Sequence, residues 1–585
     1  MMAALTLAVL TSSQTKIFPD TSSVPAAEKG YAFADEPHHF QLALRSDTVQ
    51  FFPVSVQVAA DLPVEVYKTG FVPVVHPMAQ AGPEGYARTE AGLYPDPLYV
   101  RPPCPVVEKA GQIWREADTK QTINLASCHT VPLWITLNPE GEALADGEYP
   151  VTVRIVSLTD GTELQTLTYT VRVLPHRLAE NRVYYTNWFH CDCLADIYGI
   201  EVWSSRFWEI LPYWLKNAAK HGMTTLLVPA FTPPLDTPVG HERMNVQLAD
   251  ITADGDGGYS FDLTRLERFL RLAMDCGIRY FEHAHFFSQW GAAHAPNIYA
   301  RTPEGYRRIF GWETDASGEE YRVFLEAYLT ALNALSDRLG IRDRWVFHIS
   351  DEPSPEHLDN YLKAKALVQP FVGDCPLADA VYFAEYAENG SVHTPVAEIG
   401  HADAFAKSCG SDRMDPAGTN AVPLWLYYTG GPSKVTNRML PHTHARTRVL
   451  GAILYRYGAS GFLHWGYNFY YDRMSVGLFH PLSDPCAYKD MPGSTYLAYP
   501  APDGKPIPSV REMLMGEAMC DLRALWKAEE ILGSDRVLAR MEEVFGAPVT
   551  CRTIPEGELL LQLRKRLAEE VSMPATLQDP LISPG

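Results

Sequence analysis

The chain has 585 residues, about four times the length of a typical single domain, so we expect two to four domains. Apolar residues make up 46% and charged residues 20%, which excludes wholly disordered, collagen-like and coiled-coil chains. Acidic side chains outnumber basic ones by 70 to 49, and a net charge of −21 would repel a phosphate backbone. We therefore expect no nucleic-acid partner.

The N-terminal segment resembles a signal peptide only weakly. The apolar run from Met2 to Leu10 is short, and no basic residue precedes Lys16. The ten cysteines are scattered without a CxxC pair, which is typical of free thiols in a reducing compartment. We therefore expect a cytoplasmic protein. No apolar run is long enough to cross a membrane, so no membrane association is expected, and the sequence gives no oligomeric state.

Residues 1–175 are predicted to form an N-terminal β-sandwich domain. Short runs rich in Val, Thr and Tyr are broken by Pro and Gly, with no convincing helix among them. The turn sequence TDGTEL (159–164) separates two period-two segments and predicts a hairpin. The clearest predicted strands are 51–60, 62–70, 130–139, 147–158 and 164–175.

Residues 180–530 show a different pattern, in which apolar runs alternate with helix-length amphipathic stretches. The predicted strands are 183–189, 224–231, 278–286, 344–353, 369–375, 396–405, 422–430 and 458–469. The clearest predicted helices are 204–222, 261–277, 319–340, 355–368 and 442–458. Eight such strands predict a (β/α)8 TIM barrel with long loops after the strands. An open doubly wound sheet is the alternative, disfavoured because no glycine-rich phosphate loop follows the first strand.

The C-terminal part is predicted to be helical at 510–532 and 557–571. We expect the barrel domain to end at residue 530 and residues 531–585 to form a helical tail. The expected fold is therefore α/β plus all-β, with a β-sandwich, a barrel and this tail in chain order.

The strongest candidate for chemistry is HISDEP (348–353), at the end of the fourth predicted barrel strand. Active sites of such barrels lie at the carboxyl ends of the strands. Asp351 and Glu352 are adjacent carboxylates, and two close carboxylates cannot both ionise easily, so one pKa rises. A protonated and an ionised carboxyl group together suit glycosidic bond cleavage. The alternative is that Asp351 caps a helix beginning near Pro355 while Glu352 is only solvated.

Other barrel strands also end in aromatic or hydrogen-bonding side chains, which suit the faces and hydroxyl groups of a sugar. The candidate substrate-binding residues are Asn187, Trp188, His190, Asp236, His283, Tyr382, Trp425, Tyr427, Trp465, Tyr467 and Asn468. For any single aromatic residue among them, packing in the core is the alternative explanation.

Two short segments raise the possibility of a metal site, His190-Cys-Asp192 and His283-Ala-His285. No second HxH pair and no aspartate at the eighth strand complete a ligand set. We therefore expect neither a metal nor another cofactor, with a metal-dependent hydrolase as a minor alternative.

The chain resembles glycoside hydrolase family 123 over most of its length. The resemblance rests on KIFPD (16–20), NWFHCDCLADIYG (187–199), AAKHGMTTLLVPAFTPPLDT (218–237), HISDEPSPEHLDNYLKAKALV (348–368), GFLHWGYNFYYDR (461–473) and PSVREMLMGEAMCDLRAL (508–525). It implies a β-sandwich followed by a (β/α)8 barrel. It also implies a retaining N-acetyl-β-galactosaminidase in which the substrate's own acetamido oxygen attacks the anomeric carbon. By this resemblance Glu352 is the general acid/base, and Asp351 orients the acetamido group.

The leading hypothesis is therefore a retaining β-N-acetylhexosaminidase-like glycosidase. The alternatives are a glycosidase acting on a sugar without an acetamido group, and a carbohydrate-binding protein with an inactive barrel. The presence of both Asp351 and Glu352 argues against the inactive barrel.

Overall fold

The computed structural model describes residues 5–47, 52–78, 84–100, 120–288, 291–414, 422–430 and 434–573. Its N-terminal part contains two five-stranded sheets. The first has the order β1 (Leu5–Ser12), β3 (His38–Ser46), β8 (Val131–Leu137), β5 (Val64–Val74) and β6 (Gly92–Tyr99). The second has the order β2 (Lys29–Ala32), β10 (Glu163–Val173), β9 (Gly147–Ser157), β4 (Phe52–Ala60) and β7 (Lys120–Leu125). This is the predicted sheet-rich region.

The two sheets share one hydrophobic core. Every second residue of β9 faces it, and Val151, Val153 and Ile155 are all fully buried. The predicted hairpin is present, since β9 and β10 pair antiparallel with Val153 opposite Leu167. All five predicted strands are present. β3 and β6 escaped prediction because β3 is buried on both faces, which removes the period-two pattern, and β6 contains two prolines.

The next part is a nearly closed barrel of eight parallel strands. They are β11 (Tyr184–Asn187), β12 (Thr225–Val228), β15 (Tyr280–His283), β18 (Trp345–Val346), β19 (Ala378–Val381), β20 (Thr394–Glu398), β21 (Trp425–Tyr427) and β22 (Gly461–His464). Consecutive barrel strands pair with each other, except β18 and β19, and β22 pairs with β11. A single parallel bridge between Phe347 and Leu377 joins the ends of β18 and β19. This cyclic order differs from that of an open doubly wound sheet.

Helices connect the barrel strands. They are α1 (Cys191–Tyr198), α2 (Ser205–Lys220), α3 (Thr264–Asp275), α4 (Glu319–Leu339), α5 (Leu358–Val372), α6 (Glu385–Glu388), α7 (Ala402–Cys409), α8 (His444–Arg448) and α9 (Leu450–Arg456). Short 3₁₀ turns occur at Arg342–Arg344, Pro355–His357, Ile399–His401 and Arg473–Ser475. Ser204 caps α2 by accepting a hydrogen bond from the amide of Phe207, and the helix continues through Pro212.

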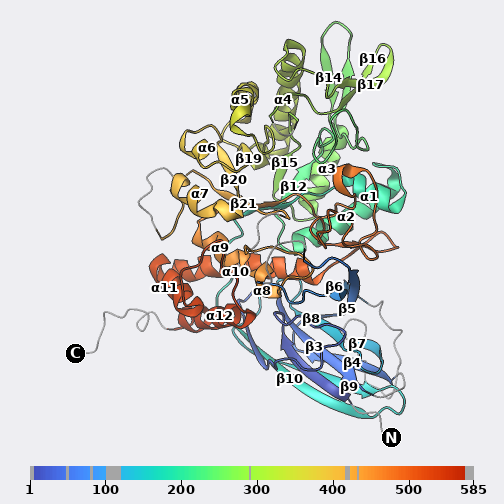
Figure 1. Cartoon of the computed structure of the whole chain (residues 1–585), viewed down its shortest axis with the longest axis vertical. Helices are drawn as coiled ribbons and strands as arrows, with labels where there is room; N and C mark the ends of the chain where they lie inside the picture. Colours follow the sequence, from blue (N-terminus) through green and yellow to red (C-terminus); the bar gives the residue numbers. More distant parts are fainter. Residues whose placement is uncertain are drawn as a thin grey trace, which may run out of the picture.

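One predicted strand of the barrel is wrong in position. The proposed fifth strand at 369–375 overlaps the last turn of α5, and the strand begins only at Ala378. A short apolar run such as Phe371-Val372 does not distinguish a helix from a strand. The structure also has a four-stranded sheet that the sequence did not predict, at the end of the molecule away from the N-terminal sheets (Figure 1). Its strands are β13 (Asp250–Ala253), β14 (Tyr259–Asp262), β16 (Ile298–Thr302) and β17 (Gly305–Phe310).

The C-terminal helices lie between the N-terminal sheets and the barrel (Figure 1). They are α10 (Val510–Leu532), α11 (Ser534–Phe545) and α12 (Gly557–Val571), preceded by the short strands β23 (Tyr499–Pro500) and β24 (Pro506–Ile507). Buried ion pairs fasten α10 on both sides. Arg511 of α10 pairs with Asp96 of β6 at 2.9 Å, and Glu517 of α10 pairs with Arg448 of α8 at 2.8 Å.

None of the described helices combines the length and apolar character needed to cross a bilayer. In the same described part of the chain the cysteines are free, as the scattered spacing predicts; they are Cys128, Cys191, Cys193, Cys276, Cys375, Cys409, Cys486, Cys520 and Cys551.

Candidate active site

A cavity of about 460 Å³ lies at the carboxyl ends of the barrel strands. Several predicted site residues line it: Trp188, Asp236, Asp351, Glu352, Tyr382, Tyr427 and Trp465. They come from segments that follow six different strands, so the barrel brings together residues far apart in the sequence. Both carboxylates of HISDEP therefore face one cavity.

The backbone explains how adjacent carboxylates share a wall. Side chains of neighbouring residues on a regular strand point to opposite faces. Here the strand has already ended, and Glu352 adopts a left-handed conformation with φ of 45°, while its amide donates to the carbonyl oxygen of Ala380 at 3.1 Å. The hydroxyl of Tyr427 then donates to Oε1 of Glu352 at 2.6 Å. Ser354, not Asp351, precedes the turn at Pro355–His357, so the capping alternative is not realised.

Asp351 is the carboxylate with the altered acidity. Burial, and then the neighbouring charge of Glu352, raise the pKa of Asp351 well above its ordinary value, while His348 opposes this rise. Within the described residues Asp351 has no hydrogen-bond partner, so its oxygens are available to a ligand. Two coupled carboxylates of this kind lose their protons in separate steps, and one proton is held to higher pH.

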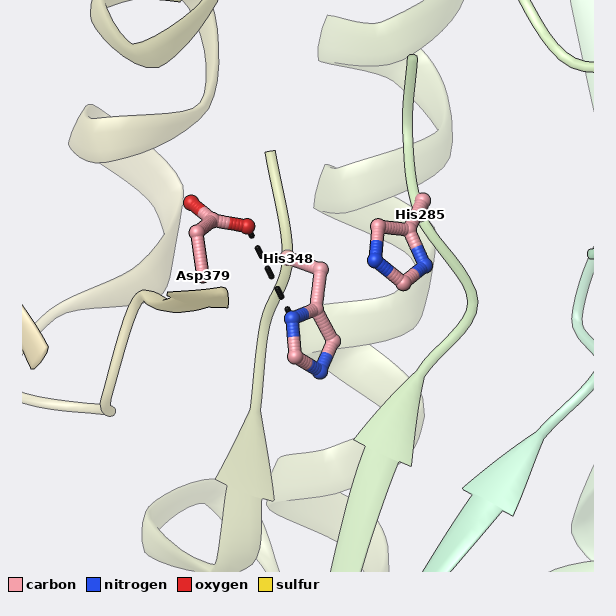
Figure 2. A group of neighbouring side chains, drawn as sticks. All are labelled: His285, His348 and Asp379. Carbon is pink, nitrogen blue, oxygen red and sulfur yellow. Dashed lines mark ion pairs between the residues drawn. The ribbon is translucent and has the colours of Figure 1, made fainter. Parts of the chain in front are cut away.

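Three buried side chains, Glu282, His348 and Asp379, form a charged network, and Figure 2 shows two of them, His348 and Asp379. Nε2 of His348 lies 2.6 Å from Oε1 of Glu282, and its Nδ1 lies 3.6 Å from Oδ1 of Asp379. Burial disfavours the imidazolium, but the hydrogen bonds and charges of Asp379 and Glu282 outweigh it and raise the pKa of His348 to about 10. His348 is therefore a cation held between two buried anions.

The network reaches both the cavity and the chain that carries Asp351. The indole of Trp188, which lines the cavity, donates to Oε1 of Glu282 at 2.5 Å. Oδ1 of Asp379 accepts from the amides of Ile349 at 3.0 Å and Ser350 at 3.2 Å. The residues that lead directly into Asp351 are thus fixed by a carboxylate from the next strand.

His285, His348 and Asp379 also lie close enough to be considered as metal ligands, with candidate ligand atoms within 4.8 Å of one another. The two imidazole rings are stacked, with centroids 4.5 Å apart and planes 17° from parallel. In Figure 2, Nδ1 of His348 points at Asp379 and away from His285. Nearly parallel rings do not aim their nitrogens at one point, so this geometry fits an ion-pair network better than a metal centre.

His348→Gln is expected to destabilise the protein by about 3–5 kcal/mol, because it leaves two buried carboxylates without their cation. The pKa of His348 rises from 6.5 to about 10 on folding, so its electrostatic contribution is complete below about pH 6.5 and is lost as the pH rises toward 10. Thermal melts from pH 6 to pH 10 should show the gap between wild type and variant shrinking with pH. The exposed His241, changed to Gln, serves as the control. A gap that stays constant with pH would contradict the charged state of His348.

The remaining predicted site residues do not line the cavity; they are Asn187, His190, His283, Trp425, Tyr467 and Asn468. All are buried. Asn187 accepts from Arg438, and Asn468 bonds the backbone of His190, whose Nε2 lies 2.8 Å from the carbonyl oxygen of Trp465.

His283, Tyr467 and Trp425 also contact other residues of the protein. Nε2 of His283 lies 2.8 Å from the hydroxyl of Tyr328, and burial lowers the pKa of His283 to about 3. Tyr467 donates to Glu512 of α10 at 2.8 Å. Trp425 stacks on Tyr184 with ring centroids 5.1 Å apart. The contacts of these side chains are with protein.

Trp465 and Trp425 make a matched pair for testing sugar stacking. Trp465 is partly exposed in the cavity, whereas Trp425 is fully buried in the barrel. Trp465→Ala is expected to weaken sugar binding about tenfold, with a small change in melting temperature. Trp425→Ala is expected to cost about 3–5 kcal/mol of stability, as a core cavity does. A binding titration measures the first effect and a thermal melt the second. If Trp465→Ala lowered stability without weakening sugar binding, the sugar would not stack on Trp465.

Sequence reasoning missed much of one cavity wall. The segment between β22 and β23, residues 465–498, contributes six lining residues besides Trp465: Arg473, Met474, Tyr488, Lys489, Met491 and Ser494. Residues at the ends of strands were the signal used, and this segment runs far beyond its strand. Its length, with almost no regular structure, was the available signal, because long loops after barrel strands build binding sites.

The comparisons with known proteins agree with this architecture. A solved structure of a family 123 glycoside hydrolase from Clostridium perfringens, described in work on glycolipid glycan hydrolysis, is 12% identical with a TM-score of 0.70, covering 98% of each chain. A Bacteroides uniformis β-glucuronidase (11% identity, TM-score 0.29, 81% of this chain and 48% of that one) is much less similar. A β-galacturonidase of Eisenbergiella tayi is also much less similar, with 11% identity and a TM-score of 0.26 over 80% of this chain and 64% of that one. No curated protein matches the chain.

The family assignment rests on the sequence. Residues 188–527 match the model of the glycoside hydrolase 123 catalytic domain, which is more than half of the chain. This range contains the barrel strands from β12 onward and both carboxylates of the cavity wall. The chain therefore belongs to glycoside hydrolase family 123 and is a glycosidase.

Proposed function

We propose that the protein is a retaining β-N-acetylhexosaminidase of the N-acetyl-β-galactosaminidase type, working by substrate-assisted catalysis on a (β/α)8 barrel. The observation that carries the proposal is the placing of Asp351 and Glu352, adjacent in sequence, on one wall of the cavity. A conventional retaining pair needs carboxyl groups about 5 Å apart on either side of the reacting carbon. Adjacent carboxylates suit a reaction in which the nucleophile belongs to the substrate.

The proposed first step uses both carboxyl groups. Glu352 donates its proton to the glycosidic oxygen as the bond to the anomeric carbon breaks, and the acetamido carbonyl oxygen forms the new bond to that carbon. The resulting oxazolinium-like ring is positive, and Asp351 accepts its N–H and offsets its charge. In the second step Glu352 takes a proton from water, which opens the ring with overall retention.

The electrostatics support this division of roles. In the free protein Asp351 holds its proton to higher pH than usual. A substrate N–H that bonds to Asp351 favours its anionic form, and the proposal assigns the donation of the proton to Glu352. The hydroxyl of Tyr427, 2.6 Å from Glu352, fixes the direction of that carboxyl group.

A second candidate is a glycosidase that acts on sugars without an acetamido group. Asp236 favours it, because this third carboxyl group lines the same cavity and could act as an enzyme nucleophile. In that case Asp351 would have another role.

Aryl β-glycosides that differ only at the 2-position separate the two functions. The proposal expects cleavage of the 2-acetamido substrates and at least ~10²-fold slower cleavage of the 2-hydroxy ones, because these lack the internal nucleophile. The opposite preference would overturn it. Asp236→Asn is the matched variant, since it would abolish cleavage only if Asp236 is the nucleophile.

Other aspects of the protein's biology remain proposals. The Clostridium perfringens relative is described as hydrolysing glycolipid glycans, and we propose glycans of this class as candidate substrates. The division at 1–175, 180–530 and 531–585, and the cytoplasmic location, rest on the sequence alone.

A further inference from the structure

Two basic side chains line the same cavity as the acidic pair. Arg473 and Lys489 both belong to the segment that follows β22, and both are exposed. Their segment packs against Asp236, which follows β12: Ser475 donates to the carbonyl oxygen of Asp236 at 2.9 Å, and Tyr488 donates to its Oδ1 at 3.2 Å. In the strand order, β15 separates β12 from β18, after which Asp351 and Glu352 follow. The cavity therefore has a carboxylate wall and a separate cationic wall, which the segment after β22 carries.

Neither cation is neutralised by an ion pair or hydrogen bond from any residue that the structure describes. Lys489 lies over the ring of Tyr488, with Nζ 5.2 Å from the centroid. Carboxylates are plentiful in a chain with 70 acidic and 49 basic residues, so partners for surface cations are easily found. Two unpaired cations on one cavity wall thus stand out from the charge balance of the chain.

The acid on this side of the cavity is Asp236, and it is already engaged. Its Oδ1 accepts from the hydroxyl of Tyr488 at 3.2 Å. Burial raises the pKa of Asp236, and the charge of Arg243, the hydroxyl of Tyr488 and the charge of Lys489 partly offset this rise. Two cations against one carboxyl group leave this wall with an excess of positive charge. Ser494, on the same wall, adds a buried hydroxyl without a hydrogen-bond partner among the described residues.

We propose that the substrate carries an oxyanion substituent, a sulfate, phosphate or carboxylate, which Arg473 and Lys489 bind in the same cavity as Asp351 and Glu352. This inference rests on the proposed function and deepens it by naming the substrate class. A guanidinium group binds an oxyanion through two parallel N–H donors, and an ammonium group adds a mobile point charge. A neutral sugar would leave both cations unused.

Three chromogenic substrates test the proposal. They are the neutral aryl N-acetyl-β-galactosaminide, its 6-O-sulfate, and the same neutral sugar on an aryl group that bears a carboxylate. The sulfate arm places the anion on the reacting sugar, and the carboxylate arm places it on the leaving group. At least one anionic substrate should show a kcat/KM at least ~10-fold above the neutral one, at low salt.

The variant that tests the cationic wall is Arg473→Gln with Lys489→Gln. It should lower the ratio of kcat/KM for the preferred anionic substrate to kcat/KM for the neutral substrate by about 10-fold to 10²-fold. The control is Lys565→Gln with Arg566→Gln. These two exposed residues of α12 remove the same charge far from the cavity and should change neither value. Half-molar salt should also reduce the anionic preference, because exposed charges are screened.

Binding is measured as well, by the shift in melting temperature with the non-hydrolysable thioglycosides of the neutral and sulfated sugars. A sulfate-dependent shift that the wall variant loses supports the inference even if turnover follows the second candidate function. Equal kcat/KM for all three substrates, in wild type and wall variant alike, overturns the inference while leaving the acetamido mechanism intact. The inference is also overturned if the wall variant keeps the preference for the anionic substrate while the control variant loses part of it. The attraction would then come from the overall charge of the protein and not from Arg473 and Lys489.

Discussion

Glu352→Gln is expected to lower kcat by at least ~10²-fold on substrates with a poor leaving group, because the amide cannot protonate the departing oxygen. An aryl group of low pKa leaves without a proton, so the loss on such a substrate should be much smaller. Steady-state kinetics across a series of aryl leaving groups measures the difference. The structural reason is the position of Glu352 in the cavity wall, with its carboxyl group fixed by Tyr427.

The control for this variant is Glu356→Gln. Glu356 lies four residues further along the chain, is exposed, and does not line the cavity. Its activity should match that of wild type. If Glu352→Gln lost the same factor on every leaving group, the residue would not be the general acid, and a structural role would explain the loss.

Asp351→Asn is expected to lower kcat about 10²-fold to 10³-fold while keeping the size of the side chain. The amide no longer offsets the positive charge that develops as the acetamido group closes onto the anomeric carbon. A thiazoline mimic of the cyclised intermediate should therefore inhibit wild type strongly and the variant weakly. Inhibition constants for both proteins, beside those for a simple sugar, separate this effect from general loss of binding.

The pH profile of the same variant gives an independent readout. Asp351→Asn removes the carboxyl group whose pKa is raised by burial and by the neighbouring charge of Glu352. Any titration step that Asp351 contributes to the pH profile of kcat/KM in wild type should therefore be absent from the profile of Asp351→Asn. A labelled adduct on Asp236, Asp351 or Glu352 after treatment with a 2-fluoro sugar would reject substrate assistance and favour a nucleophilic carboxylate.

The order of the barrel strands could be predicted because each strand is a local apolar run with its own turn signals. The same locality explains the errors. Phe371 and Val372 form a short apolar run that suits a helix or a strand equally, and only packing decides. Helix 510–532 was predicted to the residue, since its serine cap and its long amphipathic pattern are both local.

The candidate site was predictable to the extent that it follows strand ends. Asp351 and Glu352 were found because they stand where a strand breaks at a proline. Asp379 escaped notice because its function depends on a contact with the amides of Ile349 and Ser350, which no sequence pattern encodes. Trp425 looked like a site aromatic, but it stands at the start of β21 and is fully buried in the barrel interior, two residues before the cavity-lining Tyr427. The two side chains share one face of the strand, and the sequence did not show how deep in the barrel each one lies.

The ion pair between Asp96 and Arg511 has a consequence for how the chain folds. Asp96 belongs to the N-terminal sheets and Arg511 to a helix that also packs on the barrel, and both charges are buried. Separating the two parts would leave Arg511 buried without its anion, a cost of about 3–5 kcal/mol. It would also expose the apolar cluster around Trp134 and Met513. We therefore expect the N-terminal sheets and the barrel to unfold together as one cooperative unit, in a single calorimetric transition. The sheets are not expected to fold or to bind sugar as a separate domain.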